Sequence, residues 1–160
     1  MFPAPQIRAP SAQGRSANFT GRTLETRVSM LLDECGYTKL GQPLQDFAQP
    51  YYVTQSRQFR SIYGGTLRID FYVWHPHKYP GGLVIECKSQ ERAGSVDEKY
   101  PYTIENLRST RCATILVVEG NGPKIGALDW CRRQAAGSEW FRFYHGYQSF
   151  RQAVMKEGLL

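Results

Sequence analysis

The chain has 160 residues, and its 20 lysine and arginine residues against 14 aspartate and glutamate residues give a formal net charge of +6 at pH 7. This length is sufficient for one domain with a substantial core, and no apolar run is long enough to cross a bilayer, so we expect no membrane association. The four cysteines are widely spaced, without a C-x-x-C pair, which argues against structural zinc and a secreted disulfide framework. We therefore expect a cytoplasmic protein with reduced cysteines, and the basic charge favours a polyanionic partner.

The first predicted elements are a flexible arm and a helix. Residues 1–18 contain no acidic residue, are rich in proline, alanine, serine and glutamine, and lack the apolar segment of a secretory signal. We therefore expect a flexible N-terminal arm followed by one domain over residues 19–160. A helix is predicted from about Gly21 to Cys35, with Gly36 after its end. Apolar residues at helical spacing support it, namely Leu24, Val28, Leu31 and Cys35.

Three strands are predicted next, over about Pro50–Gln55, Thr66–Trp74 and Gly82–Lys88. The second and third are rich in β-branched, aromatic and aliphatic residues. Residues 75–81 between them are typical of a turn, so these two strands can form an antiparallel hairpin.

Three polar side chains should meet on this hairpin. Glu86 and Lys88 lie two residues apart in one strand, hence on the same side of it, and the hairpin brings Asp70 of the other strand beside Glu86. By the same alternation, Asp70 should share its face with Tyr72 and Trp74. The opposite face of that strand is predicted to carry Ile69, Phe71 and Val73.

This D-x15-E-x-K pattern suits a hard divalent cation. Mg²⁺ prefers oxygen ligands and is typically held by one or two carboxylates together with substrate phosphate. The cation makes water easier to deprotonate and offsets charge on phosphate oxygens. Lys88 should stay protonated beside Asp70 and Glu86, which favours an electrostatic role. The pattern predicts metal-dependent phosphodiester hydrolysis; the alternative is an ordinary exposed strand face with an ion pair.

The remaining elements complete a mixed α/β pattern. A helix is predicted over about Gly94–Arg108, where Pro101 predicts either a kink or the true start of the helix. The apolar run Cys112–Glu119 indicates a central strand buried on both faces. After it come a helix over about Lys124–Ala136, a strand over Trp140–Tyr144 and a helix over Tyr147–Lys156.

The arrangement resembles the PD-(D/E)XK nuclease superfamily, which includes restriction and homing endonucleases and junction resolvases. Asp70 and the Glu86-Cys87-Lys88 triplet match its motif, although Ile69 stands where a proline often precedes the first aspartate. The resemblance covers roughly residues 20–120. It implies a restriction-endonuclease-like core ordered α-β-β-β-α-β, here with an extra C-terminal helix, strand and helix.

The resemblance also implies roles for further residues. Glu25 of the first helix would reach the metal, directly or through water; the alternative is an acidic residue that stabilises the first helical turn. The backbone carbonyl of Cys87 would be a metal ligand beside Asp70 and Glu86. Gln90 would support the site or contact phosphate. The implied cofactor is Mg²⁺, with Mn²⁺ as a substitute.

A basic stretch precedes the Asp70 strand. No acidic residue occurs from Phe47 to Ile69. Arginine and glutamine contact phosphates and the edges of guanine and adenine, so this stretch is predicted to bind double-stranded DNA; the alternative is a solvated loop and strand. The candidate DNA-binding residues are Arg57, Gln58, Arg60 and Arg68, with Gln55 in the same stretch.

The predicted activity is that of a metal-dependent DNA endonuclease, with site-specific cleavage of the restriction or homing type favoured. A structure-selective junction resolvase, a non-catalytic nucleic-acid-binding module of the same fold, and an RNA nuclease remain as alternatives. A single small domain with one site cuts one strand, so double-strand cleavage predicts a homodimer or a higher symmetric oligomer.

Overall fold

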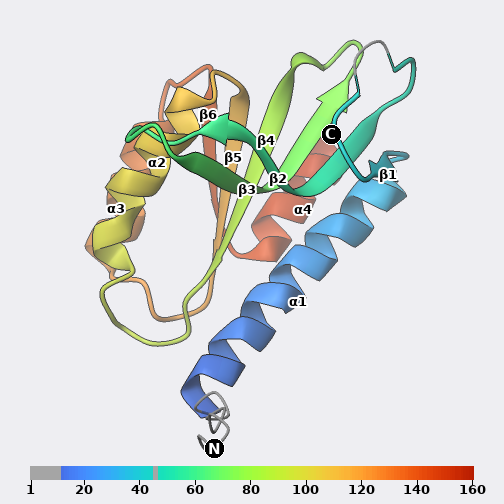
Figure 1. The fold of residues 1–160 in the computed structure, drawn as a ribbon. Coiled ribbons are helices and arrows are strands. Elements are labelled where there is room, and N and C mark those ends of the chain that lie inside the picture. Colours follow the sequence, from blue (N-terminus) through green and yellow to red (C-terminus); the bar gives the residue numbers. More distant parts are fainter. Residues whose placement is uncertain (1–11, 45–46) are drawn as a thin grey trace, which may run out of the picture.

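A six-stranded mixed sheet with the order β1-β2-β3-β4-β5-β6 forms the centre of the protein (Figure 1). The computed structural model describes residues 12–44 and 47–160, with side chains from Thr23 onward. Strands β2, β3 and β4 pair antiparallel, whereas β1 with β2, β4 with β5 and β5 with β6 pair parallel. The strands are β1 (Thr38–Leu40), β2 (Tyr51–Arg60), β3 (Thr66–His75), β4 (Tyr79–Ser89), β5 (Ala113–Glu119) and β6 (Phe141–His145).

Helices cover both faces of the sheet, which gives three layers (Figure 1). On one face, α1 (Ala12–Glu34) and α4 (Tyr147–Glu157) enclose the larger core cluster with inward side chains of β2 to β5. On the other face, α2 (Tyr100–Ser109) and α3 (Ile125–Ala135) pack on β5 and β6. No helix in the described part of the chain is long and apolar enough to cross a membrane.

The predicted fold class is confirmed. The order helix, three strands, helix, strand is present in α1, β2, β3, β4, α2 and β5, and the predicted C-terminal helix, strand and helix follow as α3, β6 and α4. Two features of the sheet were not predicted. The short edge strand β1 pairs with β2, and β2 extends to Arg60 instead of ending near Gln55.

Helix α1 is longer than predicted, because it begins at Ala12 and not near Gly21. Of the predicted arm, residues 1–11 lie outside the described residues, and residues 12–18 belong to α1. The chain from residue 11 to residue 42 contains no proline, so no residue in it removes a helical hydrogen bond. The predicted end is correct: Gly36 has φ +85°, and the Tyr37 N–H bonds the Leu32 carbonyl, as in a Schellman cap.

The segment before α2 resolves the ambiguity at Pro101. A short 3₁₀ turn, Asp97–Lys99, precedes α2, which begins at Tyr100 with the proline in its first turn. Proline lacks an N–H group, and the first turn is the part of a helix where that group has no intrahelical acceptor. The helix proper therefore starts at the proline, and it is not a kinked helix from Gly94.

Candidate active site

The two motif carboxylates lie where β3 and β4 cease to pair regularly. The paired register of these strands ends at Phe71 and Ile85. Beyond it, the Asp70 N–H donates to Glu86 Oε2 at 3.2 Å, and the Cys87 N–H donates to Asp70 Oδ2 at 2.8 Å. Carboxylate oxygens thus take the place of backbone carbonyls as acceptors between the strands. Asp70 is 6% exposed and Glu86 7% exposed, so the predicted juxtaposition is present and both groups are buried.

Side-chain alternation along β3 is interrupted at Asp70. Phe71 packs in the core cluster on the α1 side of the sheet, whereas Ile69 packs with Val84 and Leu107 of α2 on the other side. The prediction that Ile69 shares a face with Phe71 and Val73 is therefore wrong. Across from Asp70 on β2, Gln55 has φ +55°, a left-handed conformation that L-residues rarely adopt. This conformation interrupts the regular pleat of the strand pair at the site.

The amide of Gln55 links two acidic side chains from different elements. Its Nε2 lies 3.4 Å from Glu25 Oε2 and 3.4 Å from Asp70 Oδ1. Because α1 begins at Ala12, Glu25 lies in the middle of the helix and has no role at a helical N-terminus. The structure thus brings Glu25 to the site. The sequence placed Gln55 only in the basic stretch, because nothing local signals its left-handed backbone.

Lys88 completes the cluster through an ion pair with Glu86 Oε1. Burial raises the pKa of the Glu86 carboxyl; the charge of Lys88 acts against this shift, and Asp70 adds to it. Burial alone would lower the pKa of Lys88, but the carboxylates of Glu86 and Asp70 outweigh it and raise that pKa. Lys88 therefore carries a positive charge at neutral pH, as the sequence predicted.

Gln90 holds the turn that follows β4. Its Oε1 accepts from the Tyr100 hydroxyl at 3.2 Å, and its Nε2 donates to the Arg92 carbonyl at 3.3 Å. A side chain at Gly120, where φ is +105°, would place its Cβ 2.2 Å from the Gln90 carbonyl oxygen, so glycine is required there. Gln90 accordingly positions the chain just beyond Lys88, and its described contacts do not include the two motif carboxylates.

Cys87 has its side chain in the core on the α1 side. Burial raises the pKa of its thiol, so the sulfur is a neutral apolar group and no thiolate ligand. Within the part of the chain that the structure describes, no group of three or more histidine, cysteine, aspartate and glutamate side chains forms a cluster able to hold a metal by itself. Oxygen ligands beyond Asp70 and Glu86 would have to include backbone carbonyls, water or substrate.

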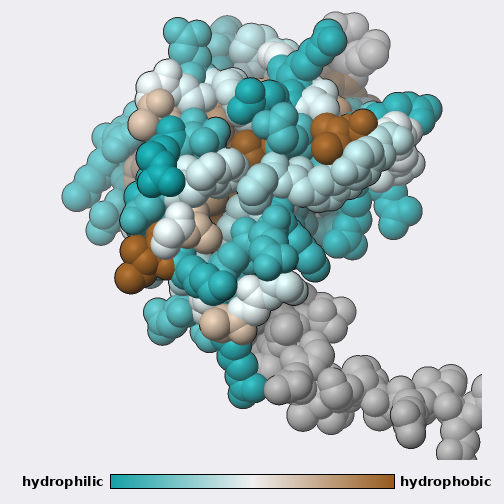
Figure 2. All heavy atoms as spheres, turned by 90° about the vertical axis from the view of Figure 1, so that its left-hand side faces the viewer, coloured by the Kyte–Doolittle hydropathy of each residue, from teal (hydrophilic) through white to brown (hydrophobic). Residues whose placement is uncertain are grey.

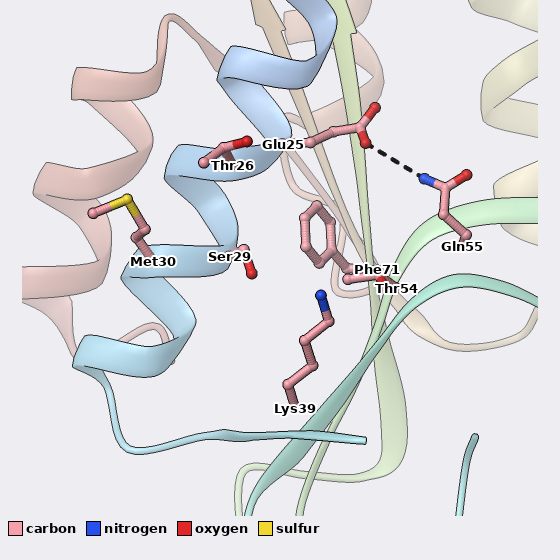
Figure 3. A pocket seen from close by; sticks show the side chains of 8 residues that line it. All are labelled: Glu25, Thr26, Ser29, Met30, Lys39, Thr54, Gln55 and Phe71. Atoms are coloured by element: carbon pink, nitrogen blue, oxygen red, sulfur yellow. Dashed lines mark hydrogen bonds between the residues drawn. The ribbon is translucent and has the colours of Figure 1, made fainter. Parts of the chain in front are cut away.

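An open pocket of about 340 Å³ lies between α1 and β2 beside this cluster (Figure 3). Glu25 and Gln55 form one end of it, and the side chain of Lys39 from β1 reaches toward its centre. Since Gln55 also contacts Asp70, the pocket adjoins the carboxylates on the α1 side. The other lining residues are Thr26, Ser29, Met30, Thr54 and Phe71.

The predicted DNA-binding residues lie on the β2–β3 hairpin. All four are exposed. The pairing of β2 with β3 shifts by one residue between Ser56 and Phe59, and this part of β2 carries Arg57 and Gln58. Arg68 is two residues from Asp70 along β3. These side chains, Arg57, Gln58, Arg60 and Arg68, give the hairpin a positive charge next to the carboxylates.

Comparison with known proteins identifies the family of the chain. A family model described as a PD-(D/E)XK nuclease superfamily domain matches residues 16–154, a range that includes every candidate site residue named above. No curated protein and no solved structure matches the chain. The chain belongs to the PD-(D/E)XK nuclease superfamily.

Proposed function

We propose that this protein is an Mg²⁺-dependent DNA endonuclease that hydrolyses phosphodiester bonds. The observation that carries the proposal is the pair of buried carboxylates, Asp70 and Glu86, between two diverging strands with Lys88 bonded to one of them. Two adjacent buried carboxylates are unfavourable unless a cation or a proton compensates them. Lys88 supplies one positive charge for two negative ones.

The donor set fits a hard divalent cation. Asp70 and Glu86 would hold it, with the backbone carbonyl of Cys87 as a further oxygen ligand and Glu25 reaching it directly or through water. All of these donors are oxygens, which Mg²⁺ prefers and Mn²⁺ accepts. A cation bound there would make water a better nucleophile at neutral pH and offset the charge that builds on phosphate oxygens.

The protein's own groups divide the remaining work. Lys88 keeps its proton, so it stabilises negative charge on the phosphate and does not act as a general base. Gln55 orients Asp70 and Glu25 relative to each other. Gln90 supports Lys88 indirectly, because it holds the turn that follows the strand.

Double-stranded DNA is the proposed substrate. The net charge of +6 favours a polyanion, and Arg57, Gln58, Arg60 and Arg68 are exposed on the strand pair that carries Asp70. Side chains of these types bind phosphates and read base edges, which supports site-specific cleavage. Because each chain holds one site, cleavage of both strands would require a homodimer or higher symmetric oligomer.

A non-catalytic binding module of the same fold is the competing interpretation. Such a module gains nothing from two buried carboxylates, which repel phosphate and oppose folding when both are ionised. The retained Asp70, Glu86 and Lys88 therefore favour an enzyme.

Cleavage of supercoiled plasmid DNA tests the proposal. The protein should nick or linearise the plasmid with Mg²⁺ or Mn²⁺ and not with EDTA, and Lys88→Ala should lose this activity. Lys124→Ala is a matched control, because Lys124 is an exposed lysine at the start of α3. Discrete products would indicate sequence or structure specificity. Salt-sensitive binding without cleavage under any metal would support the binding module instead.

A further inference from the structure

Two tyrosines stack on the surface at the tip of the β2–β3 hairpin. The rings of Tyr63, in the hairpin turn, and Tyr102, in the first turn of α2, have centroids 5.7 Å apart and planes inclined by 26°. Tyr63 is 82% exposed and Tyr102 44% exposed, and the neighbouring Ile62 is 45% exposed. Single exposed apolar residues are ordinary, but three adjoining ones, two of them stacked, indicate an interaction site.

The hairpin tip is held rigidly against α2. The Ile62 N–H donates to Oδ1 of Asn106, a buried residue of α2, at 2.9 Å. The hydroxyl of Ser109, also in α2, donates to the Arg60 carbonyl at 3.1 Å, and the Ser61 N–H closes the turn on the Gly65 carbonyl at 2.7 Å. These bonds hold the backbone next to Tyr63, and its ring stacks on Tyr102, so less ordering is needed when a ligand binds.

Two chain segments connect this tyrosine pair to the candidate active site. Strand β3 leads from the tip at Gly65 to Asp70, five residues and so about 17 Å at about 3.4 Å per residue. Helix α2 leads back through Tyr100, whose hydroxyl bonds Gln90 just after Lys88. The tyrosine pair therefore flanks the site, and the roughly 17 Å between Gly65 and Asp70 corresponds to about five nucleotides of a duplex strand at about 3.4 Å each.

The surroundings favour nucleic acid over protein as the occupant. The chain from Phe47 to Ile69 has three arginines and no acidic residue, so the hairpin that presents Tyr63 attracts phosphates. Figure 2 shows the face of α2 and the hairpin tip: it is largely hydrophilic, with apolar residues in small separate groups. The exposed apolar groups on this face are too small to form the apolar core of an obligate protein interface.

We propose that Tyr63 and Tyr102 form a stacking platform for unpaired nucleobases, so that the preferred substrate is DNA in which single-stranded bases adjoin a duplex. The inference rests on the proposed nuclease function and specifies its substrate. Bases inside a duplex stack on one another and offer no free face, whereas an unpaired base can lie on an exposed aromatic ring. The open face of Tyr63 supplies that ring, and Tyr102 supports it from behind.

Binding measurements with a cleavage-deficient protein test the platform. In an Asp70→Asn background with Mg²⁺, fluorescence anisotropy would compare a blunt duplex with the same duplex carrying a single-stranded tail of about ten nucleotides. Stacking on one aromatic ring contributes about 1–3 kcal/mol per base, so Tyr63→Ala should weaken binding of the tailed duplex by about 5- to 150-fold. Binding of the blunt duplex should not change.

Matched variants separate stacking from apolar contact. Tyr63→Trp should retain tail binding, since it keeps a flat aromatic ring, and Tyr63→Leu should lose it. Ile125→Ala, which removes another exposed apolar side chain on α3, should have no effect. Rescue by leucine, or equal losses for both DNAs, would overturn the proposal. So would unchanged binding of both, which would leave the patch to a protein partner.

Cleavage assays with the protein that keeps Asp70 separate a failure of the stacking platform from a failure of the proposed nuclease function. If that protein cleaves DNA and Tyr63→Ala cleaves tailed and blunt substrates like the parent, the nuclease function holds and the platform is wrong. If no DNA is cleaved but tail binding depends on Tyr63, the platform holds and the catalytic function is wrong. If both hold, cuts in tailed duplexes should lie about five nucleotides from the junction, by the strand spacing above.

Discussion

Replacement of Asp70 by alanine and by asparagine should separate its structural role from its proposed catalytic role. Asp70 Oδ2 accepts the buried Cys87 N–H at 2.8 Å. Alanine leaves this donor without an acceptor, which costs about 1–3 kcal/mol. For a chain of this size, 1 kcal/mol corresponds to about 2–4 °C in Tm. Asp70→Ala should therefore melt about 2–12 °C lower than the parent in EDTA.

Asparagine should behave differently in the same assay. Its carbonyl oxygen keeps the bond to Cys87, and loss of the charge removes one cause of the raised pKa of Glu86. Asp70→Asn should accordingly melt closer to the parent than Asp70→Ala does in EDTA. Both variants should lack plasmid cleavage, because neither provides the second carboxylate.

Added Mg²⁺ provides the decisive comparison. At about 100 times its Kd, a ligand that binds only the folded state adds about 2.7 kcal/mol, which corresponds to a rise of about 5–11 °C in the Tm of the parent. Asp70→Asn should show little of this rise. The reasoning is refuted if Asp70→Asn keeps the full Mg²⁺-dependent shift or cleaves DNA, or if it melts as low as Asp70→Ala in EDTA.

Three further predictions concern neighbouring residues. The left-handed backbone of Gln55 is strained by about 1–3 kcal/mol, so Gln55→Gly should melt no lower than the parent. It should nevertheless cleave DNA about 10- to 100-fold more slowly, because Asp70 loses its amide partner. Gln55→Ala should melt lower than Gln55→Gly, and equal melting temperatures would contradict the strain. Burial raises the pKa of Glu86 above the usual 4.5. In EDTA, the contribution of protonated Glu86 to the free energy of unfolding should therefore be complete below pH 4.5 and be lost as the pH rises through the pKa of the folded state. Urea unfolding between about pH 4 and about pH 8 should show this loss in the parent and not in Glu86→Gln. Arg57→Ala should weaken DNA binding and reduce the slope of log K against log salt concentration by about 0.9, the value for one lost phosphate contact. Arg133→Ala on α3 is the control and should leave this slope unchanged. If Arg57→Ala has the same slope as the parent, Arg57 does not contact the DNA.

Local sequence was sufficient for the order of the elements and for the motif pair. Turn residues 75–81 between two β-rich runs specify a hairpin, and the hairpin brings Asp70 beside Glu86 whatever packs around it. The two-residue period of a strand likewise keeps Lys88 within reach of Glu86. These features depend on backbone geometry over short distances, which the residue types encode directly.

Only the tertiary structure decided how the site is completed and flanked. Glu25 reaches Asp70 through Gln55, a residue 30 positions later in the chain, and Asn106 of α2 holds Ile62 across a separation of 44 residues. The interruption of alternation at Asp70 lies opposite the left-handed backbone of Gln55 on the paired strand, and residue type does not report that conformation. Contacts of this kind depend on how helices pack on the sheet, and local propensity carries no information about residues so distant in sequence.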